Sequence, residues 1–99
     1  MFSAEKKTEG RTTRLILTGR IDSTTAPEFE KAVKGATDGT QTLIMDFSKL
    51  DYISSAGLRV LLSVHKIMDR QGILKVANAG ETIMEIFEVT GFSEILNLV

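Results

Sequence analysis

The chain has 99 residues, of which 42% are hydrophobic and 25% are charged, and its formal net charge is −1. This composition indicates one globular domain over residues 1–99 and excludes a disordered chain or a coiled-coil array. The absence of cysteine excludes disulfides and thiolate nucleophiles. The near-neutral charge argues against a nucleic-acid partner. No segment resembles a signal peptide or a membrane span of ~20 apolar residues, so we expect a cytoplasmic protein without direct membrane insertion.

The first part of the chain predicts a hairpin followed by a helix. Phe2 to Thr8 and Thr13 to Thr18 have strand-forming composition, and Gly10 marks the turn between them. The segment Thr25-Ala-Pro-Glu28 predicts a helix start, because a threonine cap followed by glutamate three residues later can form a capping box. Gly39 lies beyond the expected end of this helix. One face of the helix would carry Phe29, Ala32, Val33 and Ala36.

The second part predicts a βαβ unit and a further helix. Thr42 to Phe47 is mostly apolar on both alternating faces, which favours a central strand covered on two sides or nearly so. Residues 55–70 follow helical periodicity, and Ile73 to Ala77 predicts a strand parallel to the first. Gly91 would cap a last helix. The resulting fold class is α/β with about four strands, while residues 94–99 are too short to assign. The helix over 55–70 would have an apolar stripe of Leu58, Leu61, Leu62, His65 and Met68 beside a polar strip of Arg59, Ser63, Lys66 and Arg70.

The candidate site is the turn that joins the central strand to this long helix. Ser54 and Ser55 would place two hydroxyls at the helix N-terminus, where free amides and the helix dipole favour an anion such as a phosphate. The alternative interpretation is structural, because serine is a preferred N-cap. Asp22 ends the strand that contains Gly19, and its simplest role is an Asx turn or a cap for the residues that follow.

Catalysis is not expected. The only histidine, His65, is ten residues beyond Ser55 on the same predicted helix, so the two side chains lie ~15 Å apart along its axis. A serine hydrolase needs a base within ~3 Å of its nucleophile. No cluster has metal-ligand spacing and no phosphate-binding glycine loop is present, so we expect neither a metal nor a cofactor. Asp46 is interpreted as a residue that helps to build the loop, and Asp51 as a solvated turn residue.

Two separated segments resemble a known family. Leu17-Thr-Gly19-Arg-Ile-Asp22 and Met45 to Leu58, with its core Asp51-Tyr-Ile-Ser54-Ser55-Ala-Gly57-Leu58, are together similar to a STAS domain of the bacterial anti-sigma factor antagonist type. The resemblance implies a mixed sheet with helices packed against it. It also implies a non-catalytic binding protein that is switched by phosphorylation of one serine.

Aligned on Gly57 and Leu58, the resemblance implies that Ser55 is the phosphoacceptor and that Asp22 lies beside it. Two positions depart from the family pattern. Ser54 stands where these proteins often carry aspartate, and Ala56 stands where they often carry a second hydroxyl. The implied partner-binding surface comprises Asp22, Ser23, Ser54, Ser55, Ala56, Gly57 and Arg59.

The implied partners are an anti-sigma factor serine kinase and a PP2C-type phosphatase. The unphosphorylated chain would bind the kinase and free a sigma factor, and the phosphatase would reset the phosphorylated chain. An alternative is a constitutive STAS subunit of a transporter or of a stressosome-like assembly. In such an assembly the same surface would serve as permanent packing.

Overall fold

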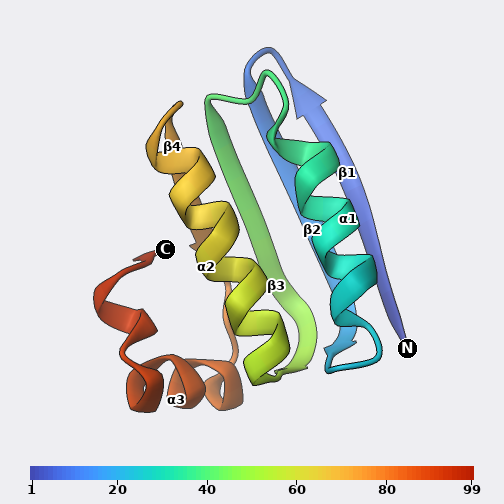
Figure 1. Cartoon of the computed structure of the whole chain (residues 1–99), viewed down its shortest axis with the longest axis vertical. Coiled ribbons are helices and arrows are strands. Elements are labelled where there is room, and N and C mark those ends of the chain that lie inside the picture. The colour runs from blue at the N-terminus through green and yellow to red at the C-terminus, as the bar shows by residue number, and fades with distance from the viewer.

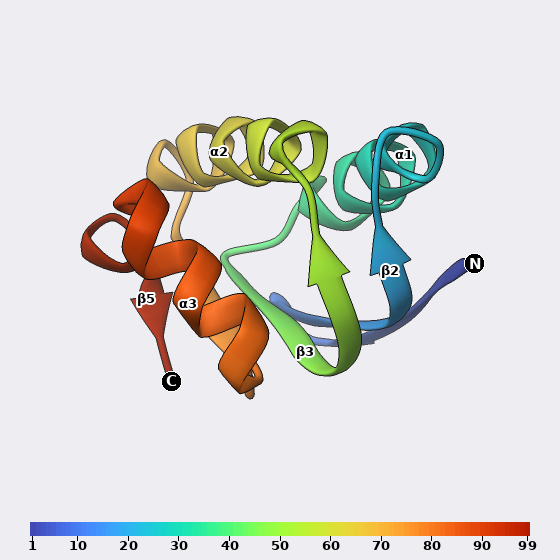
Figure 2. The same ribbon diagram turned by 90° about the horizontal axis from the view of Figure 1, so that it is seen from below.

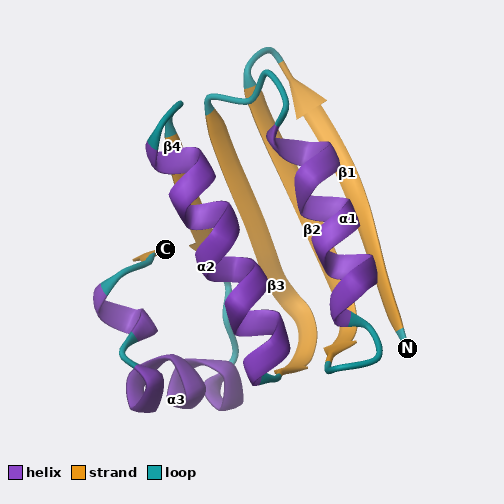
Figure 3. Ribbon diagram, viewed as in Figure 1, coloured by secondary structure: helices purple, strands orange, loops and turns teal.

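The computed structural model describes residues 1–99 as a mixed five-stranded sheet with three α-helices (Figures 1 and 3). The predicted hairpin, the βαβ unit and the last helix are all present. One short 3₁₀ turn, η1, follows the last helix. In chain order the elements are β1 Phe2–Glu9, β2 Thr12–Ile21, α1 Ala26–Thr37, β3 Thr42–Ile53, α2 Ser55–Asp69, β4 Ile73–Ala77, α3 Glu81–Thr90, η1 Phe92–Glu94 and β5 Asn97–Leu98.

The strands are ordered β1-β2-β3-β4-β5, and only β1 and β2 are antiparallel. The expectation of about four strands therefore missed β5, in which Asn97 pairs with Lys75 of β4. A two-residue strand has no periodicity of its own and forms only through this pairing. Gly91 ends α3 in the left-handed conformation at φ 82°, as predicted.

Helices α1 and α2 lie side by side on one face of the sheet (Figure 2). The alternating side chains Leu15 and Leu17 of β2 and Leu43 and Met45 of β3 point to these helices and are buried. The opposite face is only partly shielded, since Ile44 is half-buried and Ile73 is exposed. Strand β3 is therefore covered fully on one side and partly on the other, which agrees with the expectation of a strand covered on two sides or nearly so. Phe47 also contacts Phe87 of α3, with ring centroids 6.1 Å apart.

Helix α1 begins where the sequence predicted, but not through a capping box. Thr25 is the N-cap residue and makes no side-chain capping bond. Its hydroxyl instead donates to the Arg20 carbonyl at 3.0 Å and accepts from the Asp22 amide at 2.8 Å. The threonine therefore closes the turn before the helix rather than the first turn of the helix itself.

None of the helices has the length and apolar character needed to cross a lipid bilayer.

Candidate functional site

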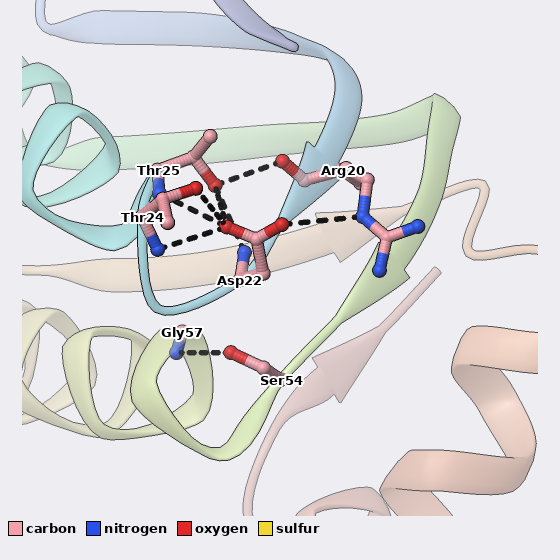
Figure 4. A network of polar contacts seen from close by, with 6 residues as sticks. All are labelled: Arg20, Asp22, Thr24, Thr25, Ser54 and Gly57. Carbon is pink, nitrogen blue, oxygen red and sulfur yellow. Dashed lines mark hydrogen bonds and ion pairs between the residues drawn. The ribbon is translucent and has the colours of Figure 1, made fainter.

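The turn between β2 and α1 is organised by one carboxylate. The Oδ1 atom of Asp22 accepts from the Thr24 amide at 2.9 Å, the Thr24 hydroxyl at 2.6 Å and the Thr25 amide at 3.1 Å (Figure 4). This is the Asx-type turn that the sequence suggested. The hydrogen bond from the Thr24 hydroxyl, helped by the Thr25 amide, lowers the pKa of Asp22 to about 2. The carboxylate is therefore ionised throughout the physiological range.

The two serines have different environments. Ser54 is the N-cap of α2, and its Oγ accepts from the Gly57 amide at 3.4 Å (Figure 4). Ser55 is the first residue of α2 and is exposed, and its hydroxyl makes no hydrogen bond with the chain. The structural interpretation therefore applies to Ser54, which caps the helix, whereas the Ser55 hydroxyl takes no part in the cap.

The structure brings the Asp22 turn and the serine turn together. The Ser54 amide donates to the Ile21 carbonyl at 2.8 Å, so the end of β2 is joined directly to the start of α2. Gly57 is buried in this junction. A Cβ atom on Gly57 would lie 2.6 Å from Ile21 Cγ2 and 2.7 Å from Ile53 Cγ1. The small residue is therefore required for the close approach of α2 to both strands.

The remaining predicted site residues line a hollow beside the serine turn. Ser23 stands on one wall, and Ala56 and Arg59 stand on the other. Arg59 is exposed and lies one turn along α2 from Ser55. The seven residues of the expected surface are thus contributed by two adjacent turns and the first turns of α2. Asp22 directs its carboxylate to its own turn and to Arg20, rather than to either serine.

Arg20 is a site residue that the sequence analysis missed. Its Nε lies 3.3 Å from Asp22 Oδ2, and its guanidinium lies 5.0 Å from the centroid of the Tyr52 ring. The only sequence signal was its position two residues before Asp22. The contact with Tyr52 depends on the parallel pairing of β2 with β3, which places Arg20 opposite Tyr52.

Asp46 lies away from this surface in a separate polar network. Its carboxylate accepts from the Ser48 amide at 2.9 Å, from Arg14 at 3.0 Å and from the Asn78 amide group at 3.3 Å. Burial alone would raise the pKa of Asp46, but the hydrogen bonds from Ser48, Arg14 and Asn78 lower it to about 2. Asp46 therefore links β3 to Arg14 of β2 and to Asn78 after β4, and the loop that it was expected to help build is absent because β3 continues to Ile53.

Two further residues considered in the sequence, Asp51 and His65, take no part in the contacts of the serine turn. Asp51 is exposed but lies within β3, because this strand continues to Ile53, so the expectation of a turn residue was wrong. His65 is half-buried, and its Nε2 lies 3.6 Å from Asp69 Oδ2 one turn along α2. No group of three or more His, Cys, Asp or Glu side chains lies close enough together to hold a metal ion.

Comparisons with known proteins point to one family. The profile of the STAS domain matches residues 3–99. BtrV of Bordetella bronchiseptica, named as a candidate anti-sigma factor antagonist, is 38% identical over 80% of this chain and 70% of its own length. The anti-sigma-B factor antagonist of Bacillus subtilis is 32% identical over 83% of this chain and 76% of its own length.

Two solved structures support the same fold. An anti-sigma factor antagonist from Mycobacterium paratuberculosis matches with a TM-score of 0.90 at 21% identity, over 99% of this chain and 85% of that chain. The phosphorylated form of SpoIIAA, a Bacillus cell fate determinant, matches with a TM-score of 0.73 at 19% identity, over 100% of this chain and 91% of that chain. At this level of identity the structural likeness concerns the fold alone.

Proposed function

Because the chain belongs to the STAS domain family, we propose that it is an anti-sigma factor antagonist, a binding protein that is controlled by phosphorylation of Ser55. The unmodified chain binds an anti-sigma factor kinase and thereby frees a sigma factor. Phosphorylation of Ser55 releases the kinase, and a PP2C-type phosphatase restores the binding form. The names of the Bordetella and Bacillus relatives support the antagonist role.

The observation that carries this proposal is the division of roles between the two serines. Ser54 is engaged as the N-cap of α2, whereas the exposed Ser55 hydroxyl has no partner in the chain. Transfer of a phosphoryl group to Ser55 therefore breaks no hydrogen bond that holds the fold. The product would lie at the positive end of the helix dipole, which favours the dianion.

The proposed binding surface surrounds Ser55 and uses the residues expected from the sequence. Gly57 contributes by allowing the close approach of α2 to β2 and β3. Asp22 contributes by holding the neighbouring turn, whose Ser23 lines the same hollow as Ala56 and Arg59. The surface therefore consists of Asp22, Ser23, Ser54, Ser55, Ala56, Gly57 and Arg59.

A phosphate on Ser55 would weaken binding through charge and desolvation. It adds about −1.5 to −2 charges at neutral pH to a surface that has no net charge between Asp22 and Arg59. Acidic groups of the kinase would be repelled by the phosphate, and apolar groups of the kinase would remove water from it at a cost in binding free energy. The fold itself need not change, because the hydroxyl of Ser55 does not support it.

The experiment that tests this proposal combines phosphosite mapping with binding. The chain is isolated from its own cells across growth and stress and mapped by mass spectrometry, with and without phosphatase treatment. Affinity for a purified anti-sigma factor kinase of the same genome is then measured for wild type, Ser55→Ala and Ser55→Asp. The matched control is Ser3→Asp, at an exposed position of β1 outside the proposed surface. We expect phosphate on Ser55, unchanged binding for Ser55→Ala and binding weaker by about tenfold or more for Ser55→Asp.

Equal affinities for Ser55→Ala and Ser55→Asp, together with no phosphate under any condition, would contradict the switch. That result would favour the constitutive subunit, in which the same surface is permanently packed.

A further inference from the structure

The outer side of α2 borders a groove that continues far beyond Ser55. One hollow, of about 380 Å³, lies between the first turns of α1 and α2, and a second, of about 310 Å³, lies along the last turns of α2. Ser63 lines both hollows, so they adjoin along the helix, and we call the two together the groove. Gln71 closes its far end by donating to the carbonyls of Thr37 and Thr40, both at 2.6 Å.

The groove carries three exposed cations. Arg59, Lys66 and Arg70 are spaced by seven and four residues, so they lie on one face of α2. None of the three belongs to an ion pair. The one acidic side chain in the lining is Glu30 of α1, and it pairs with Lys34 at 3.2 Å. We call Arg59, Lys66 and Arg70 the α2 basic strip.

Apolar atoms accompany the basic strip along the groove. Ala26, Pro27 and Val60 line the first hollow, and Ile67 lines the second. A row of unpaired cations beside the half-buried Val60 and Ile67 is complementary to an amphipathic segment with acidic residues. A nucleic acid is a poorer match, because the whole chain has a net charge of −1 and Glu30 lies in the same groove.

We infer that the groove bordered by the α2 basic strip docks an acidic, amphipathic segment of the kinase whose catalytic site receives Ser55. This inference rests on the proposed function and extends the binding surface to the opposite end of α2. Only acids of that segment that pair with Arg59, one turn from Ser55, would lie close enough to repel the phosphate.

The far end of the strip should not sense the phosphate. Along the axis of α2, Lys66 lies roughly 16 Å and Arg70 roughly 22 Å from Ser55, at 1.5 Å per residue. Both separations exceed the Debye length of about 8 Å at physiological ionic strength. Effects of sites this far apart add independently. Contacts at Lys66 and Arg70 therefore strengthen binding of the phosphorylated and unphosphorylated chains by the same factor.

The test uses a purified kinase that phosphorylates Ser55, in binding measurements with the full chain. The variant Lys66→Glu/Arg70→Glu is compared with Lys31→Glu/Lys49→Glu, which changes the net charge equally at exposed positions outside the groove. We expect about tenfold weaker binding for the groove variant and less than twofold change for the control. The same loss should appear in the Ser55→Asp background, and the salt dependence of binding should become shallower.

A second variant, Lys66→Gln/Arg70→Gln, removes the charges without reversing them, and circular dichroism verifies that each variant is folded. Binding of both groove variants within twofold of the control would overturn the inference. If Ser55→Asp still weakened binding in that case, the proposed function would stand. A kinase that phosphorylates Ser55 but has equal affinity for Ser55→Ala and Ser55→Asp would instead contradict the proposed function. Tighter binding of duplex DNA than of the kinase, lost in the groove variant, would assign the groove to a nucleic acid.

Discussion

The amide of Ser54 donates to the carbonyl of Ile21 at 2.8 Å, and this bond joins the two turns that build the candidate site. Asp22 follows Ile21 directly, so the carboxylate turn and the helix cap are positioned by the same backbone contact. Gly57 packs into the corner that this bond creates. A substitution at any of these residues should therefore alter both the Asp22 turn and the start of α2.

Replacement of Gly57 by alanine should destabilise the protein by about 1–3 kcal/mol, although alanine is the better helix former. The added Cβ would meet Ile21 and Ile53 at distances below normal contact. Urea unfolding gives the change in free energy. The matched control is Gly35→Ala in α1, where a Cβ meets nothing within 4 Å and a stabilisation of about 0.5–1 kcal/mol is expected. A stabilising Gly57→Ala would refute the close-packing argument.

Alanine substitution of Ser54 should lower the stability of the protein but not its phosphorylation, and alanine substitution of Ser55 should do the reverse. Ser54→Ala removes the oxygen that accepts from the Gly57 amide and should cost about 0.5–1 kcal/mol. Ser55→Ala breaks no hydrogen bond and should leave the free energy of unfolding unchanged within about 0.5 kcal/mol. In a kinase assay, Ser54→Ala should still accept phosphate and Ser55→Ala should not. Phosphate transfer to Ser54 of the Ser55→Ala chain would contradict the assignment of Ser55 as the phosphoacceptor.

Asp22 should act through the shape of its turn. Asparagine keeps an oxygen that can accept from the Thr24 and Thr25 amides, whereas alanine keeps none. We expect Asp22→Ala to accelerate hydrogen exchange at both amides and to weaken kinase binding. Asp22→Asn should preserve most of the exchange protection and most of the affinity. If both variants lost affinity equally while Asp22→Asn kept its protection, the kinase would be recognising the charge itself.

Asp46 should make stability depend on pH in the acid range. Its folded pKa of about 2 lies below the usual 3.8, so its contribution is present above pH 4 and is lost as the pH falls from about 4 to 2. The contribution is at most roughly 2 kcal/mol, because solvent screens part of it. Urea unfolding between pH 2 and 7 should show a shallower acid slope for Asp46→Asn than for wild type. The pKa of Asp22 is also lowered to about 2, so Asp22→Asn is the control for the contribution of Asp22 to the acid slope. Identical slopes for Asp46→Asn and wild type would show that the network does not stabilise the carboxylate.

The helices could be located from the sequence because their apolar stripes are long and regular. Helix α2 was expected over 55–70 and is observed as Ser55–Asp69. Its polar strip is exposed as predicted, since the periodicity alone decides which side of an amphipathic helix faces solvent. The start of α1 was also placed correctly, but the capping box was not, because the Thr25 hydroxyl donates to the Arg20 carbonyl five residues earlier in the chain.

The strand ends could not be predicted with the same accuracy. Strand β3 continues through Asp51 to Ile53 while its pairing with β2 shifts register after Ile16 and again after Gly19. Such irregularities depend on both strands and leave no signal in either one alone. Within the site, the serine pair was recognised from a local motif. The contacts of Arg20 with Asp22 and Tyr52 were missed, because the second of them joins different strands.

The packing of Arg20 over Tyr52 also gives the protein a built-in optical label. Tyr52 is the only tyrosine and the sequence has no tryptophan, so ultraviolet-excited emission of the whole chain comes from this one ring. The ring touches the arginine that pairs with Asp22, next to the proposed binding surface. Binding of a partner that contains neither tryptophan nor tyrosine, or of a phosphate that draws Arg20 away, can therefore be followed by intrinsic fluorescence without attaching a dye.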